Sequence, residues 1–174
     1  NAEAELKMAD MFDICHGGGL DLCALGLAEI DAMGNVNVSK FHGRVTGPGG
    51  FIDLAQHTKK LILMGTFTAG GLREHCEGGR LVIDREGKYQ KFKTDIEQVT
   101  FSGDYAAAHG QHVLVVTERA VFRLTPQGLM LTEIAPGVDL ERDILSQMEF
   151  RPLIADDLQL MDGRIFQPNP MGLS

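Results

Sequence analysis

The chain has 174 residues, of which 44% are hydrophobic and 23% are charged, and its formal net charge is -8. This length and composition are typical of a soluble globular protein with a hydrophobic core. The acidic balance argues against a nucleic-acid partner, because proteins that bind nucleic acids normally present a basic face. No uninterrupted apolar run reaches the roughly 18 residues of a membrane span, so we expect no membrane partner.

The chain begins at an asparagine without a boundary in composition, and we expect it to be part of a longer polypeptide. Its three cysteines, Cys15, Cys23 and Cys76, are an odd number without a Cys-x-x-Cys spacing. This usage is typical of reduced thiols, and with no visible signal peptide it indicates a cytoplasmic protein. A zinc site built from Cys15, His16, His75 and Cys76 would lack that spacing, so no metal is expected.

The first part of the chain predicts a helix followed by two strands. Residues 2–11 are mostly good helix formers. Residues 20–30 are mostly apolar, as in a strand buried on both faces, and residues 31–35 read as a turn. Residues 36–39 alternate apolar and polar side chains, which predicts the second strand.

A glycine-rich loop at residues 46–51 is the stretch around which we expect the function to be organised. Its three glycines and Pro48 cannot lie inside a regular element, and the apolar-rich stretch after it predicts a helix ending at a lysine pair. Such a loop presents unpaired backbone N–H groups to an oxyanion, a phosphate or a thioester carbonyl. Because Pro48 has no N–H, the donors would come from Gly49, Gly50 or Phe51. The alternative is a simple turn, and the loop has neither the Walker nor the Rossmann glycine spacing.

The remainder of the chain predicts an α/β domain. Residues 61–67 read as a short buried strand, so that strand, loop, helix and strand would form a right-handed crossover in a parallel sheet. Ligands of such sheets bind beyond the carboxyl ends of the strands, which makes Thr66 a second candidate for lining the site. The later elements are predicted as strands over 80–84 and 113–117, a helical turn over 102–110, a hairpin over 120–134, a helix over 138–148 and a tail from 151. Since no interdomain linker is visible, residues 1–174 are expected to form a single domain.

Several motifs in a fixed order resemble the family I CoA-transferases. They begin with the triple glycine and the segment after it, residues 17–39. Residues 47–53 resemble the Gly-x-Gly-Gly-Phe signature of that family, and residues 117–122 and 131–140 continue the match. The resemblance covers nearly the whole chain and is nearest to the acetate/propionate branch, which transfers CoA among short-chain acids, acetate and 3-ketoacids. It implies an α/β fold with a largely parallel open sheet, flanking helices and a C-terminal β-hairpin region.

The resemblance also implies a ping-pong reaction. A glutamate carboxylate attacks an acyl-CoA thioester, and CoA passes through a glutamyl-CoA thioester to an acceptor acid. Coenzyme A would be a substrate, and no cofactor is expected. The residues expected to supply oxyanion or CoA contacts are Gly47, Gly49, Gly50 and Phe51. The further site-lining candidates are Gly18, Gly19 and Thr66.

The nucleophile of the family is missing from its expected place. The family carries this glutamate in a Glu-x-Gly motif some tens of residues before the triple glycine, and residues 1–16 hold no such motif. Glu77 precedes a glycine pair but lies after the signature loop. We therefore expect the C-terminal CoA-transferase domain of a longer chain, with no catalytic residue of its own and no turnover alone.

The expected partners are an acyl-CoA, a short-chain carboxylic acid, the N-terminal half of the same enzyme and further copies of it in a homo-oligomer. The expected role lies in short-chain fatty acid and acetoacetate metabolism. The alternative is a non-catalytic CoA-binding or subunit-interaction module. A sugar-phosphate isomerase or deaminase would need an acid–base set that the sequence does not offer.

Overall fold

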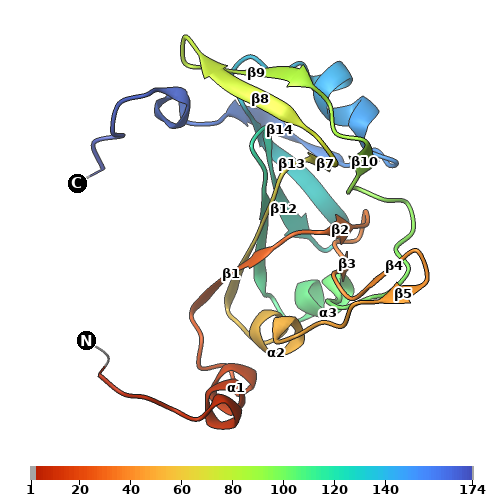
Figure 1. Cartoon of the computed structure of the whole chain (residues 1–174), viewed down its shortest axis with the longest axis vertical. Helices are drawn as coiled ribbons and strands as arrows, with labels where there is room; N and C mark the ends of the chain where they lie inside the picture. The colour runs from red at the N-terminus through yellow and green to blue at the C-terminus, as the bar shows by residue number, and fades with distance from the viewer. Residues whose placement is uncertain (1–2, 174) are drawn as a thin grey trace.

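In the computed structural model of the chain, residues 3–173 are described, and their main feature is a six-stranded sheet (Figure 1). In spatial order its strands are β1 (Leu22–Gly26), β6 (Lys60–Met64), β11 (His112–Val116), β12 (Ala120–Thr125), β13 (Gly128–Ile134) and β14 (Leu153–Leu160). The strands β1, β6 and β11 are parallel, β12 is antiparallel to both neighbours, and β14 is parallel to β13. The predicted α/β class and C-terminal hairpin are confirmed, and the sheet is mixed.

Three short helices lie at the end of the sheet where β1, β6 and β11 begin (Figure 1). They are α1 (Met8–His16), α2 (Phe51–Ala55) and α3 (Gly103–Ala108). Four two-stranded ribbons surround the main sheet: β2 (Glu29–Ile30) with β3 (Val36–Asn37), β4 (Lys40–Phe41) with β5 (Arg44–Val45), β7 (Thr68–Ala69) with β10 (Tyr89–Gln90), and β8 (Arg73–Glu77) with β9 (Arg80–Arg85). The remaining turns are η1 (Leu140–Ile144), η2 (Leu145–Gln147) and η3 (Gly163–Phe166). None of the helices within residues 3–173 is long and apolar enough to cross a membrane.

The helix after the glycine loop is shorter than predicted, and Lys60 belongs to a strand. The backbone explains this difference. The N–H of Lys59 donates to the Leu20 carbonyl at 3.2 Å, and the N–H of Lys60 donates to the Asp21 carbonyl at 3.1 Å. Pairing with the chain that leads into β1 therefore replaces the last helical turns and starts β6.

The first helix also differs from its prediction, since it spans Met8–His16 instead of residues 2–11, of which residue 2 lies outside the described residues. It ends where the N–H of Gly17 donates to the Asp13 carbonyl at 2.9 Å. The predicted tail from residue 151 is wrong, because β14 adds a backbone ladder to β13. The predicted helix over 138–148 is a π turn followed by a 3-10 turn.

Only one face of the parallel strands is buried. The side chains of Leu61, Leu63 and Val115 are at most 1% exposed and belong to the main core. On the other face, Met64 and Leu114 are 48% and 37% exposed. The strand β1 alternates between exposed and half-buried residues, so the prediction of a strand buried on both faces is wrong.

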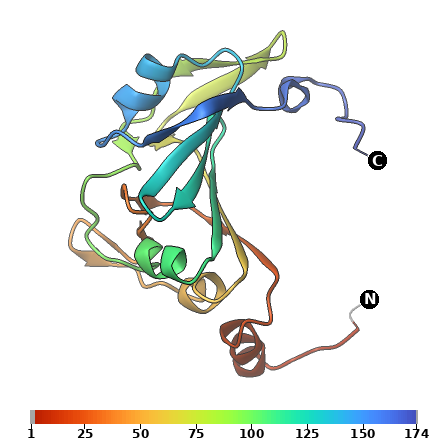
Figure 2. The ribbon, with the colours of Figure 1, turned by 180° about the vertical axis from the view of Figure 1, so that it is seen from behind.

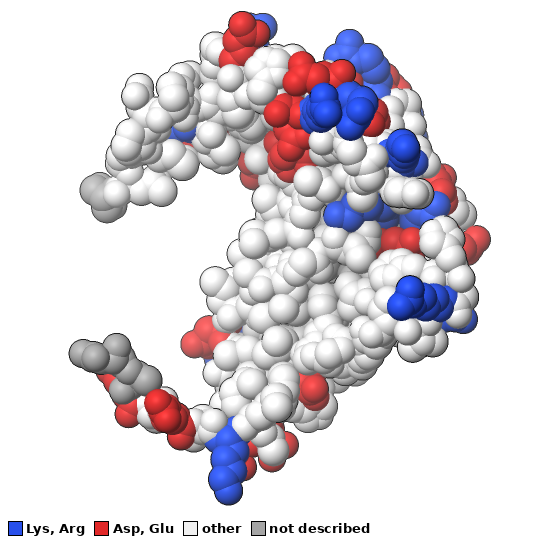
Figure 3. All heavy atoms as spheres, in the orientation of Figure 1, with Lys and Arg blue, Asp and Glu red and all other residues white. Residues whose placement is uncertain are grey.

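This exposed face lies inside a concave outline. The N-terminal arm with α1 and the C-terminal arm with η3 project on the same side of the sheet (Figures 1 and 2). The surface between the two arms carries few charged side chains in the space-filling view (Figure 3). Because a parallel sheet in an α/β protein is normally covered on both faces, this surface is a candidate for contact with other protein.

Candidate functional site

The glycine loop between β5 and α2 depends on glycine at two positions. Gly47 and Gly49 have φ angles of 82° and 55°, a region that residues with a side chain rarely adopt. The N–H groups of Thr46 and Gly47 both donate to the Ser39 carbonyl, at 2.9 and 3.1 Å, and fix the start of the loop. Gly50 completes the loop as the residue before α2.

Two amides of this loop are open. The N–H groups of Gly49 and Gly50 donate to no group within residues 3–173, whereas the N–H of Phe51 donates to the Pro48 carbonyl at 3.1 Å. The Phe51 side chain is 8% exposed and packs in the core. Of the three predicted donors, Gly49 and Gly50 are therefore free to meet an oxyanion, and Phe51 instead fixes the turn.

The loop lies against α1. A Cβ atom on Gly50 would come within 2.7 Å of the Phe12 ring, which is half-buried on that helix. The Cβ position of Gly18 lies 3.8 Å from the carbonyl oxygen of His57, just after α2. Gly19 folds back on α1, where its N–H donates to the Ile14 carbonyl at 2.9 Å. The triple glycine and the signature loop are therefore both parts of the α1–α2 corner.

Thr66, the remaining predicted lining residue, lies elsewhere. It follows the carboxyl end of β6, where its hydroxyl donates to the Thr68 carbonyl at 2.7 Å. The glycine loop lies at the end of the sheet where β6 begins, and five strand residues span roughly 16 Å. Within residues 3–173 the structure does not bring Thr66 and the loop together, because α2 is too short to carry its N-terminus to the carboxyl edge.

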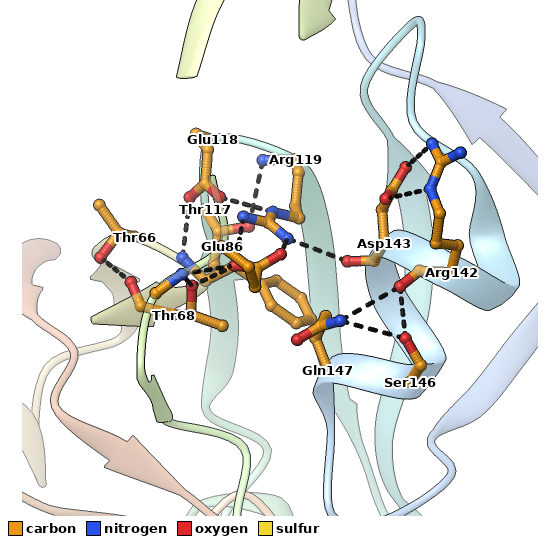
Figure 4. Close-up of polar contacts among 12 residues, drawn as sticks. Thr66, Thr68, Glu86, Thr117, Glu118, Arg119, Arg142, Asp143, Ser146 and Gln147 are labelled. Atoms are coloured by element: carbon orange, nitrogen blue, oxygen red, sulfur yellow. Dashed lines mark hydrogen bonds and ion pairs between the residues drawn. The ribbon is translucent and has the colours of Figure 1, made fainter. Parts of the chain in front are cut away.

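A buried ion network occupies the carboxyl edge instead (Figure 4). At its centre is Arg119, which is fully buried and follows β11. Its guanidinium donates to both carboxylate oxygens of Glu86, at 2.7 and 3.1 Å, and to Glu118 at 2.6 Å. It also lies over the Phe67 ring, 5.1 Å from the centroid. A bidentate arginine–carboxylate pair of this kind is specific in geometry as well as strong.

This network fixes the loop after β6. Glu118 accepts the Phe67 N–H at 2.8 Å, and Glu86 accepts a hydrogen bond from the Thr68 hydroxyl. The same arginine donates to the Asp143 carbonyl at 3.1 Å, which ties η1 to the sheet. Three segments that are distant in sequence are thus held by one buried cation.

Glu86 makes the network sensitive to acid. Burial on its own would raise the pKa of this carboxyl, but the hydrogen bonds from Arg119 and Thr68 outweigh burial and hold the pKa below the ordinary value of 4.5. Because the pKa in the folded state is the lower one, the stabilisation is complete above the unfolded pKa and is lost as pH falls through the folded value. As pH decreases below about 4.5, we expect the free energy of unfolding to decrease. In Glu86→Gln this dependence on pH should be weaker.

Chemical unfolding at a series of pH values measures this effect. The matched control is Glu141→Gln, since Glu141 is exposed and only meets Arg151 at 3.5 Å. An unchanged acid slope in Glu86→Gln would show that the network does not titrate as described.

Sequence reasoning did not assign a role to Arg119 or Glu86. The available signal is the position of Arg119 between two strongly apolar runs, since a charged residue there must find partners when both flanking strands are buried. Its partner Glu86 lies in a turn that gives no sign of burial in the sequence. Within residues 3–173, no group of three or more His, Cys, Asp or Glu residues is arranged to hold a metal ion.

Comparison with known proteins finds similar proteins for nearly the whole chain. No protein-family model matches the chain. It is 50% identical over 172 residues to the acetate CoA-transferase YdiF of Escherichia coli K12, which covers 99% of this chain and 32% of that protein. It is 48% identical over 182 residues to the caffeate CoA-transferase of Acetobacterium woodii, over 99% of this chain and 34% of that protein. The crystal structure of the acyl-CoA transferase YdiF apoenzyme from E. coli O157:H7 matches with a TM-score of 0.97 and 49% identity, over 100% of this chain and 34% of that one. Over nearly its whole length, the chain is therefore similar in sequence and fold to part of these CoA-transferases.

The resemblance read from the sequence motifs is therefore confirmed, as is the CoA-transferase-like fold. The chain spans about one third of the length of these two curated relatives. Residues 47–53, which resemble the glycine signature of the family, form a loop with two open amides.

Proposed function

We propose that the chain is part of an acyl-CoA:carboxylate CoA-transferase that moves CoA between short-chain acids through a glutamyl-CoA thioester. The observation that carries this proposal is the match of 50% identity over 99% of the chain to an acetate CoA-transferase. The open N–H groups of Gly49 and Gly50 support it, because each step of the reaction passes through an oxyanion.

The proposed reaction proceeds in balanced steps. An oxygen of the glutamate carboxylate bonds to the thioester carbonyl carbon, and the carbon–sulfur bond breaks to release the CoA thiolate. The thiolate then attacks the glutamyl carbonyl of the resulting anhydride and displaces the first acid. The acceptor carboxylate repeats these steps in reverse order and leaves with CoA. The glutamate is expected outside residues 1–174, CoA is a substrate, and no cofactor is required.

The relatives do not indicate one acyl specificity, since one is an acetate and the other a caffeate CoA-transferase. We propose a short-chain acid because the sequence motifs are nearest to the acetate/propionate branch. Transfer rates from acetyl-CoA to propionate, acetoacetate and caffeate distinguish these possibilities. Faster transfer to caffeate than to the short acids would overturn the short-chain assignment and leave the transferase proposal intact.

The proposed partner is the N-terminal half of the same enzyme, which would cover the exposed face of the sheet, and the complete enzyme is proposed to form a homo-oligomer. Met64 and Leu114 on that face are half exposed, and the surface between the two arms carries few charges (Figure 3). Burial of apolar side chains is the main driving force of such contacts.

We expect Met64→Glu to weaken association of the chain with the N-terminal half by about tenfold or more, because a carboxylate would be buried without a partner. Cys76→Glu adds the same charge to the exposed strand β8, away from the main sheet, and is the matched control. Co-purification of the two halves at graded concentrations measures the difference. Equal weakening by both variants would indicate a general charge effect and would contradict this docking face.

A transfer assay tests the function itself. The complete enzyme should move CoA from acetyl-CoA to propionate, and the chain alone should not. Addition of the separately produced N-terminal half should restore turnover. Turnover by the chain alone would overturn the proposed division of the active site, and no turnover by the complete enzyme with any tested acid would favour a CoA-binding module.

A further inference from the structure

A second hollow lies apart from the glycine loop. It has a volume of about 840 Å³, which is within the range of small-molecule sites. Its walls come from the end of β1, the β4–β5 ribbon, and β7 with β10. The residues used below that line it are Leu27, Glu29, Lys88, Lys91 and Lys93. The glycine loop lines a different hollow of about 220 Å³ that shares none of these residues.

Lys91 is the unusual member of this lining. Lys91 is only 8% exposed, yet no carboxylate within residues 3–173 lies within 4.0 Å of its ammonium. The hydrogen bond that it makes is to the Thr66 carbonyl, at 2.8 Å. An ammonium has three donors, and lysine is almost never buried without a counter-charge. The cation therefore has hydrogen-bonding capacity that the described chain does not use.

The ammonium lies close against Gly65. A Cβ atom on Gly65 would lie 2.8 Å from Lys91 Nζ and 3.1 Å from the Leu27 carbonyl oxygen. The ammonium thus lies beside Leu27, which lines the same hollow, at the carboxyl ends of β1 and β6. This edge of a parallel sheet is where α/β folds bind ligands.

The other charged groups of the hollow do not satisfy Lys91. Lys93 is paired with Glu149, and Glu29 is held by the Asn37 side-chain amide at 2.7 Å. Lys88 is exposed. Burial lowers the pKa of Lys91, and the more distant Glu118 offsets this only in part. An anion in the hollow would supply the counter-charge and stabilise the ammonium form.

We propose that this hollow is an anion-binding site in which Lys91 contacts a carboxylate or phosphate oxygen of a small ligand. The two sources in a CoA-transferase are an organic acid and the phosphate groups of CoA. The choice of these two sources rests on the proposed function, whereas the geometry of the site is independent of the glycine loop.

The test measures binding to the complete enzyme by thermal stabilisation at graded concentrations of acetate, inorganic phosphate and CoA. We expect Lys91→Met to weaken binding of at least one probe by about tenfold or more, since a hydrogen bond to a charged group is lost. The matched control Lys88→Met, at an exposed lysine of the same hollow, should change the affinity for that probe by less than about threefold. An effect on acetate alone assigns the organic acid, and an effect on phosphate and CoA assigns the nucleotide.

A second pair of variants keeps the test valid if Lys91→Met does not fold. Gly65→Ala retains the charge but displaces the ammonium, whereas Gly26→Ala adds a methyl group at the end of β1, where nothing lies within 4 Å of its Cβ position. Gly65→Ala should weaken binding of the same probe, and Gly26→Ala should not. Unchanged affinity in both Lys91→Met and Gly65→Ala, or no binding of any probe to the parent, would overturn the site. If the parent enzyme binds the anion but does not transfer CoA, the proposed function is rejected and the anion-binding site is still supported.

Discussion

Replacement of Gly49 by proline is expected to lower kcat of the complete enzyme by about 100-fold to 1,000-fold. Proline removes the N–H that we propose as an oxyanion donor, and its ring fixes φ near -65°, whereas Gly49 has φ of 55°. Both effects act on the transition state more than on the bound acyl-CoA, so KM should change much less than kcat. Steady-state kinetics with acetyl-CoA and propionate measure the two parameters.

The control for backbone strain is Gly49→Ala. Alanine also suffers at positive φ, but it keeps the N–H, and nothing lies within 4 Å of the Cβ position of Gly49. Its kcat should fall by about tenfold or less, as expected for roughly 1 kcal/mol of strain. Equal losses in the alanine and proline variants would mean that loop conformation, and not the amide donor, is responsible.

Replacement of Arg119 by methionine is expected to destabilise the fold by about 3–5 kcal/mol. The substitution keeps much of the apolar stem but leaves Glu86 and Glu118 without their cation in a buried setting. Two hydrogen bonds to Glu86, one to Glu118 and one to the Asp143 carbonyl are lost together. Arg119→Lys should recover only part of the loss, since an ammonium cannot reproduce the bidentate contact.

Guanidinium unfolding of the complete enzyme, followed by far-UV circular dichroism, measures the change. The control is Arg151→Met, which breaks an exposed pair and should cost less than about 1 kcal/mol. A loss in Arg119→Met no larger than in Arg151→Met would show that the network contributes little to the fold.

Much of the fold follows from local patterns in the sequence. The hairpin of β12 and β13 is marked by two apolar runs around Pro126-Gln127-Gly128. The strands β1 and β6 both lie in short apolar runs, but their pairing with each other was not predicted, because the strand expected before the glycine loop, residues 36–39, pairs with β2 outside the main sheet. The strand β8 was not predicted, because all five of its residues are exposed and show no apolar alternation. It forms a hairpin with β9 across the turn at Gly78 and Gly79, a backbone pairing that hydrophobic periodicity does not report.

The candidate site shows a similar division. The glycine loop is recognisable because glycine at positive φ is a local requirement, seen at Gly47 and Gly49. The position of the loop relative to Thr66 was not predictable, since it depends on where α2 ends. The role of Arg119 depends on burial and on partners from three other segments, and the role of Lys91 depends on burial beside the Thr66 carbonyl. Neither can be read from a single sequence.

The most direct test of the proposed mechanism is the intact mass of the complete enzyme after treatment with acyl-CoA and then borohydride. Borohydride reduces a glutamyl thioester, so we predict a covalent change at one glutamate outside residues 1–174 in the parent enzyme, and no such change in Gly49→Pro. No covalent change in the parent enzyme, or a change at a glutamate within residues 1–174, would contradict the proposed mechanism. An unchanged signal in Gly49→Pro would show that the glycine loop is a turn that takes no part in the reaction.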